Sequence, residues 1–142
     1  MKRFKLFLYN LFFSPYRYSR KSTNWRNAFG LMPFERLLYR TMTFVGGNSI
    51  EGDYLEFGTY QGRSLASAHH IAQLYSLKKM RFYAFDSFEG LPEIQGIDRE
   101  GFCNFKKGDF SCSQEDFLKI LKRRGVDLNK VQLIPGWFDQ VL

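Results

Sequence analysis

Three short segments of the sequence carry glycines and polar or aromatic side chains that could hold a nucleoside. The first, EFGTYQGRS at residues 56–64, has an acid, two glycines four positions apart and a serine at a helix start. A glycine lets the backbone approach a ligand closely, and a serine with nearby amides can bind a carboxylate. A dinucleotide would require Gly-x-Gly-x-x-Gly, so this spacing favours a nucleoside with an amino-acid tail, although such a turn can also be purely structural.

The second and third segments each follow a further apolar run. Asp86 ends FYAFD, where a carboxylate could accept hydrogen bonds from ribose hydroxyls; a turn aspartate before Ser87 is the alternative. The run VQLIP is followed by Gly136, Trp137 and Phe138. The two aromatic side chains could pack against an adenine ring or pack in the core. A nucleoside with an amino-acid tail describes S-adenosylmethionine.

Alternating strands and helices are expected to position these segments. The hydrophobic patterns predict strands at 53–57, 80–86 and 130–135, and helices within 24–45, at 64–77 and at 113–125. This order predicts right-handed crossovers and a parallel sheet, that is, an α/β, Rossmann-like doubly wound fold. Ligands of such sheets bind beyond the carboxyl ends of the strands, where the three segments should meet.

Several side chains are expected to define the faces and ends of these helices. The buried face of the first helix is predicted to contain Phe34, Leu37, Leu38 and Met42, and that of the second Leu65, Ala68, Ala72 and Tyr75. Ser113 is the expected N-cap of the third helix. His69 and His70 are expected to lie one buried and one exposed, as structural residues rather than a catalytic base.

The excess of positive over negative charge lies in the N-terminal part of the chain. The net charge is +7, and residues 1–30 contain seven basic and no acidic residues, so the remainder is neutral. We therefore expect a basic, aromatic arm at 1–30 and a globular part at 31–142 that does not bind nucleic acid. The arm could cover a substrate, join an oligomer or make a weak contact with an anionic membrane surface. It lacks the features of a signal peptide, and the expected location is cytoplasmic.

Four ordered motifs resemble those of one enzyme family. They are GDYLEFGTYQGRSLASAHHIA, FYAFDSFEGLPE, KKGDFSCSQEDF and VQLIPGWFDQVL, which together cover most of residues 50–142. The chain is similar to the macrocin O-methyltransferases, a family of class I methyltransferases. The resemblance implies S-adenosylmethionine as the methyl donor and a small-molecule hydroxyl, often on a sugar of a natural product, as the acceptor.

The resemblance also implies roles for individual residues. Around the methionine end of the donor it places the following: Glu56, Gly58, Thr59, Tyr60, Gly62 and Ser64. It assigns the ribose to Asp86, flanked by Ser87 and Phe88, and the adenine to Gly136, Trp137 and Phe138. The catalytic base and the Mg²⁺ ligands of the family have no counterpart in this sequence, and Cys103 and Cys112 are expected to be reduced thiols.

The resemblance further implies an incomplete domain. Only three strands of the expected sheet are predicted, so the chain is interpreted as the N-terminal part of an enzyme, truncated after the third strand. The strand at 53–57 would then have one unpaired edge, which favours poor solubility and self-association. Two other functions stay open: another nucleotide-binding α/β enzyme such as a dehydrogenase, or a non-catalytic membrane-surface module that uses the basic arm.

Overall fold

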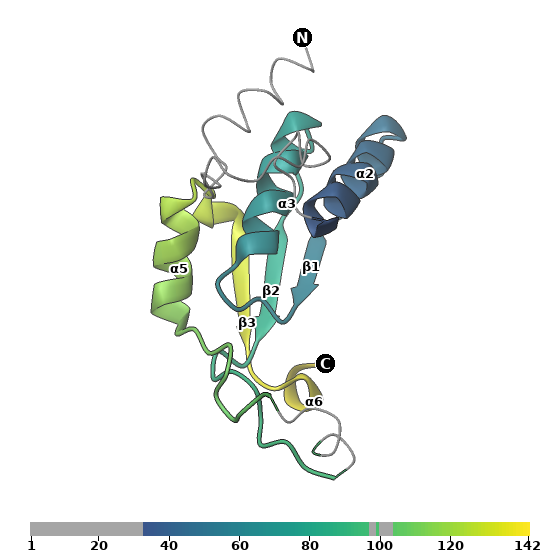
Figure 1. Ribbon diagram of the computed structural model, residues 1–142. Helices are drawn as coiled ribbons and strands as arrows, with labels where there is room; N and C mark the ends of the chain where they lie inside the picture. The colour runs from purple at the N-terminus through teal and green to yellow at the C-terminus, as the bar shows by residue number, and fades with distance from the viewer. Residues whose placement is uncertain (1–32, 97–98, 100–103) are drawn as a thin grey trace, which may run out of the picture.

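A parallel three-stranded sheet with helices on one face forms the centre of the fold (Figure 1). The computed structural model describes residues 33–96, 99 and 104–142; the predicted arm at 1–30 and Cys103 lie outside this part. In chain order the elements are α2 (Pro33–Gly47), β1 (Tyr54–Phe57), α3 (Arg63–Leu74), β2 (Phe82–Asp86), α5 (Gln114–Arg123), a 3-10 turn (Leu128–Lys130), β3 (Val131–Pro135) and α6 (Phe138–Val141). The predicted α/β class and the order of its strands and helices are confirmed.

The register of the sheet brings the three predicted segments to one edge. The strands pair in the order β1-β2-β3, with Phe57 opposite Phe85 and Asp86 opposite Pro135. The carboxyl ends of all three strands therefore lie side by side. The turn after β1, the loop after β2 and the segment after β3 leave the sheet at this edge, as the sequence predicted.

Helix α3 lies over the sheet between α2 and α5, and this position explains its burial (Figure 1). The predicted face is confirmed for Leu65, Ala68 and Ala72, which are buried in the core. The prediction for α2 is wrong at Leu37, whose side chain is 66% exposed. The buried side chains of α2 are instead Glu35 and Met42. Leu37 lies about 200° around the helix from Glu35, so its side chain faces the opposite side.

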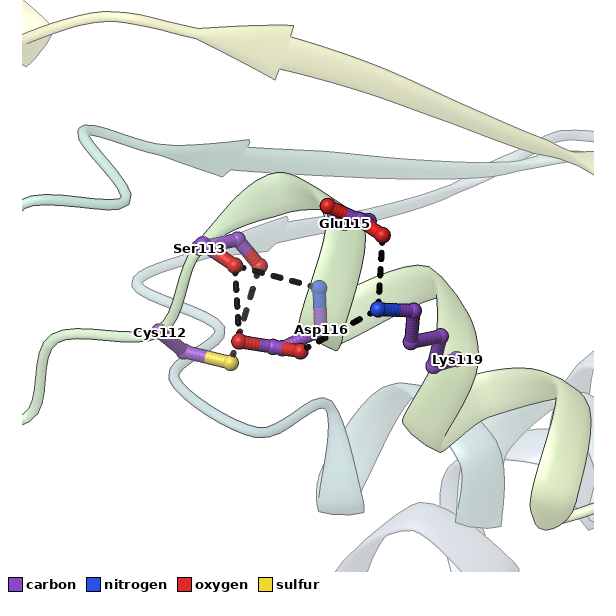
Figure 2. A network of polar contacts seen from close by, with 5 residues as sticks. All are labelled: Cys112, Ser113, Glu115, Asp116 and Lys119. Carbon is purple, nitrogen blue, oxygen red and sulfur yellow. Dashed lines mark hydrogen bonds and ion pairs between the residues drawn. The ribbon is translucent and has the colours of Figure 1, made fainter.

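Helix α5 begins with the side-chain cap that the sequence predicts (Figure 2). The Ser113 hydroxyl accepts a hydrogen bond from the backbone N–H of Asp116 at 3.1 Å and donates to its carboxylate at 2.9 Å. Lys119 forms ion pairs with Glu115 at 2.6 Å and Asp116 at 3.8 Å. The cap satisfies a free N–H at the helix start, whereas exposed ion pairs of this kind contribute at most about 1 kcal/mol.

The opposite face of the sheet is apolar. Leu55 and Phe57 alternate along β1 with the buried Glu56, so they lie on the face away from α3, and both are half-exposed. The Phe57 ring stacks on Phe85 with 4.7 Å between centroids. Within the described ranges no strand pairs with the outer edge of β1. None of the helices in that part of the chain is both long and apolar enough to cross a membrane.

Both histidines of α3 are buried. The prediction that one of them is exposed is wrong: His69 is 1% and His70 8% exposed, because α3 is covered on several sides. His69 Nε2 accepts from the Asp127 N–H at 3.3 Å, so the neutral ring carries its proton on Nδ1. His70 Nε2 lies 2.7 Å from the Arg124 carbonyl and donates to it. The pair joins α3 to the segment after α5.

We expect the free energy of unfolding to fall as the pH is lowered from about 6.5 toward 4. Burial lowers the pKa of His69 to about 4, and the neighbouring His70 and Lys130 act in the same direction. The unfolded chain therefore binds more protons than the folded chain in this window, and protonation favours unfolding. Urea unfolding at several pH values should show this slope.

His69→Gln provides the matched variant for this slope. Glutamine retains an oxygen that can accept from the Asp127 N–H but does not titrate, so the slope should become shallower. Some slope should remain, because burial also lowers the pKa of His70. An unchanged slope in His69→Gln would show that the acid sensitivity arises elsewhere.

Candidate functional site

A cavity of about 440 Å³ opens at the carboxyl edge of the sheet. Its volume lies within the range of small-molecule sites, about 300–1,000 Å³. Seven of the residues predicted from the sequence line it: Gly58, Tyr60, Asp86, Ser87, Gly136, Trp137 and Phe138. The other five predicted residues, Glu56, Thr59, Gly62, Ser64 and Phe88, are absent from its lining.

Asp86 joins the turn after β1 to the loop after β2. One carboxylate oxygen accepts from the backbone N–H groups of Thr59 at 2.6 Å and Tyr60 at 3.1 Å, and from the Thr59 hydroxyl at 3.2 Å. The other oxygen accepts from the Phe88 N–H at 2.8 Å. Asp86 therefore holds the glycine turn in place and also lines the cavity. Thr59 is buried behind the turn as one of its partners.

The two glycines of the turn have different surroundings. Both have positive φ angles, +79° at Gly58 and +63° at Gly62. A Cβ atom on Gly58 would meet no atom within 4 Å, so this position faces open space in the cavity. A Cβ atom on Gly62 would lie 2.7 Å from side-chain atoms of Phe117 and Leu121 on α5. Gly58 thus faces the open cavity, and Gly62 leaves room for α5.

Glu56 is buried beneath the start of α3. Its carboxylate accepts hydrogen bonds from the Ser64 hydroxyl at 2.9 Å and the Tyr54 hydroxyl at 2.7 Å. Burial raises the pKa of Glu56, while these hydrogen bonds and one from the Leu65 N–H act against the rise. Glu56 and Ser64 therefore tie β1 to the first turn of α3, next to the cavity.

Two aromatic residues show how the segments divide between core and cavity. Phe88 is buried, and its ring packs against Phe117 of α5 with 5.6 Å between centroids. Phe88 therefore anchors the loop after β2 to the core. Phe138 is half-exposed on the cavity wall and meets Phe57 edge to face at 6.0 Å. The cavity has three walls: the turn after β1, the loop after β2 and the segment 136–138 after β3. This third wall is fixed to β2 because the Gly136 N–H donates to the Asp86 carbonyl at 3.0 Å.

Sequence reasoning missed four lining residues in the long loop after β2: Gly90, Leu91, Pro92 and Phe110. Two backbone hydrogen bonds hold this loop together, from Leu91 N–H to Asp109 at 2.8 Å and from Gly108 N–H to Leu91 at 2.9 Å. A Cβ atom on Gly90 would lie 2.5 Å from the Asp109 carbonyl, so only glycine allows this approach. The pattern Gly-Leu-Pro was the available signal, since it indicates a constrained turn.

The comparison with protein families matches residues 25–142 to the macrocin O-methyltransferase (TylF) model. The chain belongs to this family. The match includes all three walls of the cavity, and the family named by the sequence motifs is confirmed.

Two relatives are natural-product O-methyltransferases by name. The chain is 27% identical over 117 residues to the 8-demethyl-8-(2,3-dimethoxy-alpha-L-rhamnosyl)-tetracenomycin-C 4'-O-methyltransferase of Streptomyces olivaceus, covering 80% of this chain and 44% of that protein. It is 23% identical over 122 residues to the demethyldecarbamoylnovobiocin O-methyltransferase of Streptomyces niveus, covering 82% and 47%. The chain spans about half the length of these curated relatives.

A solved structure shares the macrocin O-methyltransferase fold with this chain. The O-methyltransferase NovP superposes with a TM-score of 0.67 at 21% identity, over 76% of this chain and 46% of NovP. This likeness confirms the fold. Across residues 33–96, 99 and 104–142, no three His, Cys, Asp or Glu side chains are grouped so that they could hold a metal ion.

Proposed function

We propose that this chain forms the donor-binding part of an S-adenosylmethionine-dependent O-methyltransferase that acts on a hydroxyl of a small molecule, such as a natural-product sugar. The observation that carries the proposal is the cavity at the carboxyl ends of three parallel strands, lined by Gly58, Asp86 and Trp137. Membership of the macrocin O-methyltransferase family and the names of the relatives support the same activity.

The residues present fit such a donor. Gly58 leaves open space for close approach to the backbone, and Tyr60 stands beside it for the methionine end. Asp86 has a carboxylate on the cavity wall for the ribose, next to Ser87, and Gly136, Trp137 and Phe138 provide a surface for the adenine. The remaining predicted residues do not line the cavity but hold its walls through hydrogen bonds and packing: Glu56, Thr59, Gly62, Ser64 and Phe88.

S-adenosylmethionine, when bound, supplies a methyl group on a positively charged sulfur. The protein has to hold this methyl group in line with an acceptor oxygen and to exclude water, and positioning of this kind contributes much of the rate. Mg²⁺ and a general base for the acceptor are not assigned to any described residue.

Calorimetry with S-adenosylhomocysteine, the neutral product form of the donor, tests the proposal directly. We expect saturable binding at one site and stabilisation of the chain in thermal melts, because a ligand that binds only the folded state raises its stability. NADH serves as the comparison ligand. If NADH stabilises the chain and S-adenosylhomocysteine does not, the result would support the alternative of a dehydrogenase-like enzyme.

Replacing Gly58 by alanine is expected to reduce the affinity for S-adenosylhomocysteine by about 10- to 100-fold. The added Cβ atom enters the space left for the ligand, and overlap of this kind costs about 1–3 kcal/mol. The left-handed backbone should also lower stability by about 1–2 kcal/mol. Affinity is measured by calorimetry and stability by urea unfolding.

Gly96→Ala is the matched control for this effect. Gly96 also has a positive φ of +61° and open space around a Cβ atom, but it does not line the cavity. Its substitution should carry a similar backbone cost and leave the affinity unchanged. Equal loss of affinity in both variants would mean that Gly58 does not face the ligand.

A further inference from the structure

Two exposed aromatic side chains meet on the cavity wall. Tyr60 comes from the turn after β1 and Phe110 from the long loop after β2, and both line the cavity. Their rings contact edge to face, with 5.5 Å between centroids and 89° between planes. Tyr60 is 42% and Phe110 51% exposed, so much of each ring is open to a ligand.

The backbone holds both rings in place against a conformational cost. Tyr60 has a φ of +46° and Phe110 a φ of +61°, which is the left-handed region that bulky residues rarely adopt. Such strain persists only where surrounding contacts fix it, and it is common at ligand sites. Asp86 fixes Tyr60 through its N–H, and the contact of Gly90 with residues 108–109 fixes the segment before Phe110.

The charge of the lining suits a positively charged ligand group. Among the lining residues, all of which belong to the described part of the chain, Asp86 is the one charged side chain, and no lysine or arginine is present. The faces of aromatic rings carry negative electrostatic potential and attract cations. A carboxylate that lines the same cavity as the rings of Tyr60 and Phe110 therefore contributes to an environment complementary to a cation.

We propose that Phe110, together with Tyr60, binds the positively charged sulfonium of S-adenosylmethionine and thereby favours the donor over its neutral product. The inference rests on the proposed function and adds a residue that selects between charge states of the ligand. The donor and S-adenosylhomocysteine differ by one methyl group and one positive charge. A contact with an aromatic face responds to the positive charge, whereas contact with an aliphatic side chain responds only to the additional methyl group.

Calorimetric titration of the chain with each ligand tests this assignment. Phe110→Leu keeps an apolar side chain but removes the aromatic face, so we expect the affinity for S-adenosylmethionine to fall about threefold relative to that for S-adenosylhomocysteine. Phe110→Tyr keeps the aromatic face and should retain the ratio of the two affinities. Because Phe110 is half-exposed, the leucine variant should fold, and its thermal melt verifies this.

Phe105→Leu is the control for nonspecific effects of removing an aromatic ring. Phe105 packs against Phe110 with 5.7 Å between centroids but does not line the cavity, so its substitution should leave the ratio unchanged. Binding of both ligands with the same ratio in Phe110→Leu as in the unsubstituted chain would overturn the inference alone. If neither ligand binds the unsubstituted chain, the proposed function is overturned and this inference with it.

Discussion

Replacing Asp86 by asparagine is expected to reduce the affinity for S-adenosylhomocysteine by about 10- to 100-fold and to lower the free energy of unfolding by about 1.5–3 kcal/mol. Both oxygens of Asp86 accept hydrogen bonds, one from Thr59 and Tyr60 and the other from Phe88. An asparagine has one acceptor oxygen, so its amide group must face an N–H donor on one side. The turn after β1 or the loop after β2 then loses its anchor.

Glu93→Gln is the matched control for Asp86→Asn. It removes the same charge from an exposed position in the loop that follows β2, at a residue that does not line the cavity. Calorimetry should find its affinity unchanged, and urea unfolding should find its stability unchanged. Asp86→Asn with wild-type affinity would exclude the carboxylate from the ligand site, even if the chain were less stable.

Replacing Gly62 by alanine is expected to destabilise the fold by about 2–5 kcal/mol. About 1–2 kcal/mol comes from the left-handed backbone at +63°, and the rest from forcing a Cβ atom into the core. The atoms it would meet, 2.7 Å away, belong to Phe117 and Leu121, which are fully buried and cannot move aside easily. Urea unfolding measures the loss directly.

The contrast with Gly58→Ala separates the two glycines of one turn. Gly58→Ala has a similar backbone cost but no overlap with the core, so it should be the more stable variant and the weaker binder. Gly62→Ala, under conditions in which it is folded, should retain more of its affinity. Equal free energies of unfolding for the two variants would contradict the tight packing of Gly62 against Phe117 and Leu121 of α5.

The sequence predicts the sheet and the place of the cavity well, for reasons that can be named. β1, β2 and β3 are apolar runs bounded by turn residues, and parallel pairing then brings their carboxyl ends together. Asp86 could be placed at this edge from its position alone. The N-cap Ser113 was also predictable, because the cap depends on residues within one turn of it.

The sequence cannot divide a motif between ligand-facing and core-facing residues. Gly58 and Gly62 look equivalent in EFGTYQGRS, and only the packing of α5 shows that Gly62 faces Phe117. His70 is buried by elements distant in sequence, which no local pattern reveals. Phe110 reaches the cavity because residues 90–91 bind 108–109, a contact across a long loop. These are tertiary effects, and local propensity does not encode them.

The order of the strands also has a consequence for how the chain folds. β1, β2 and β3 pair in the order in which a ribosome produces them, so each new strand meets its partner already present. The cavity nevertheless acquires its third wall, Gly136 to Phe138, only after β3 has joined the sheet. A small molecule that needs all three walls can therefore stabilise the finished site, but it cannot guide the earlier steps of folding.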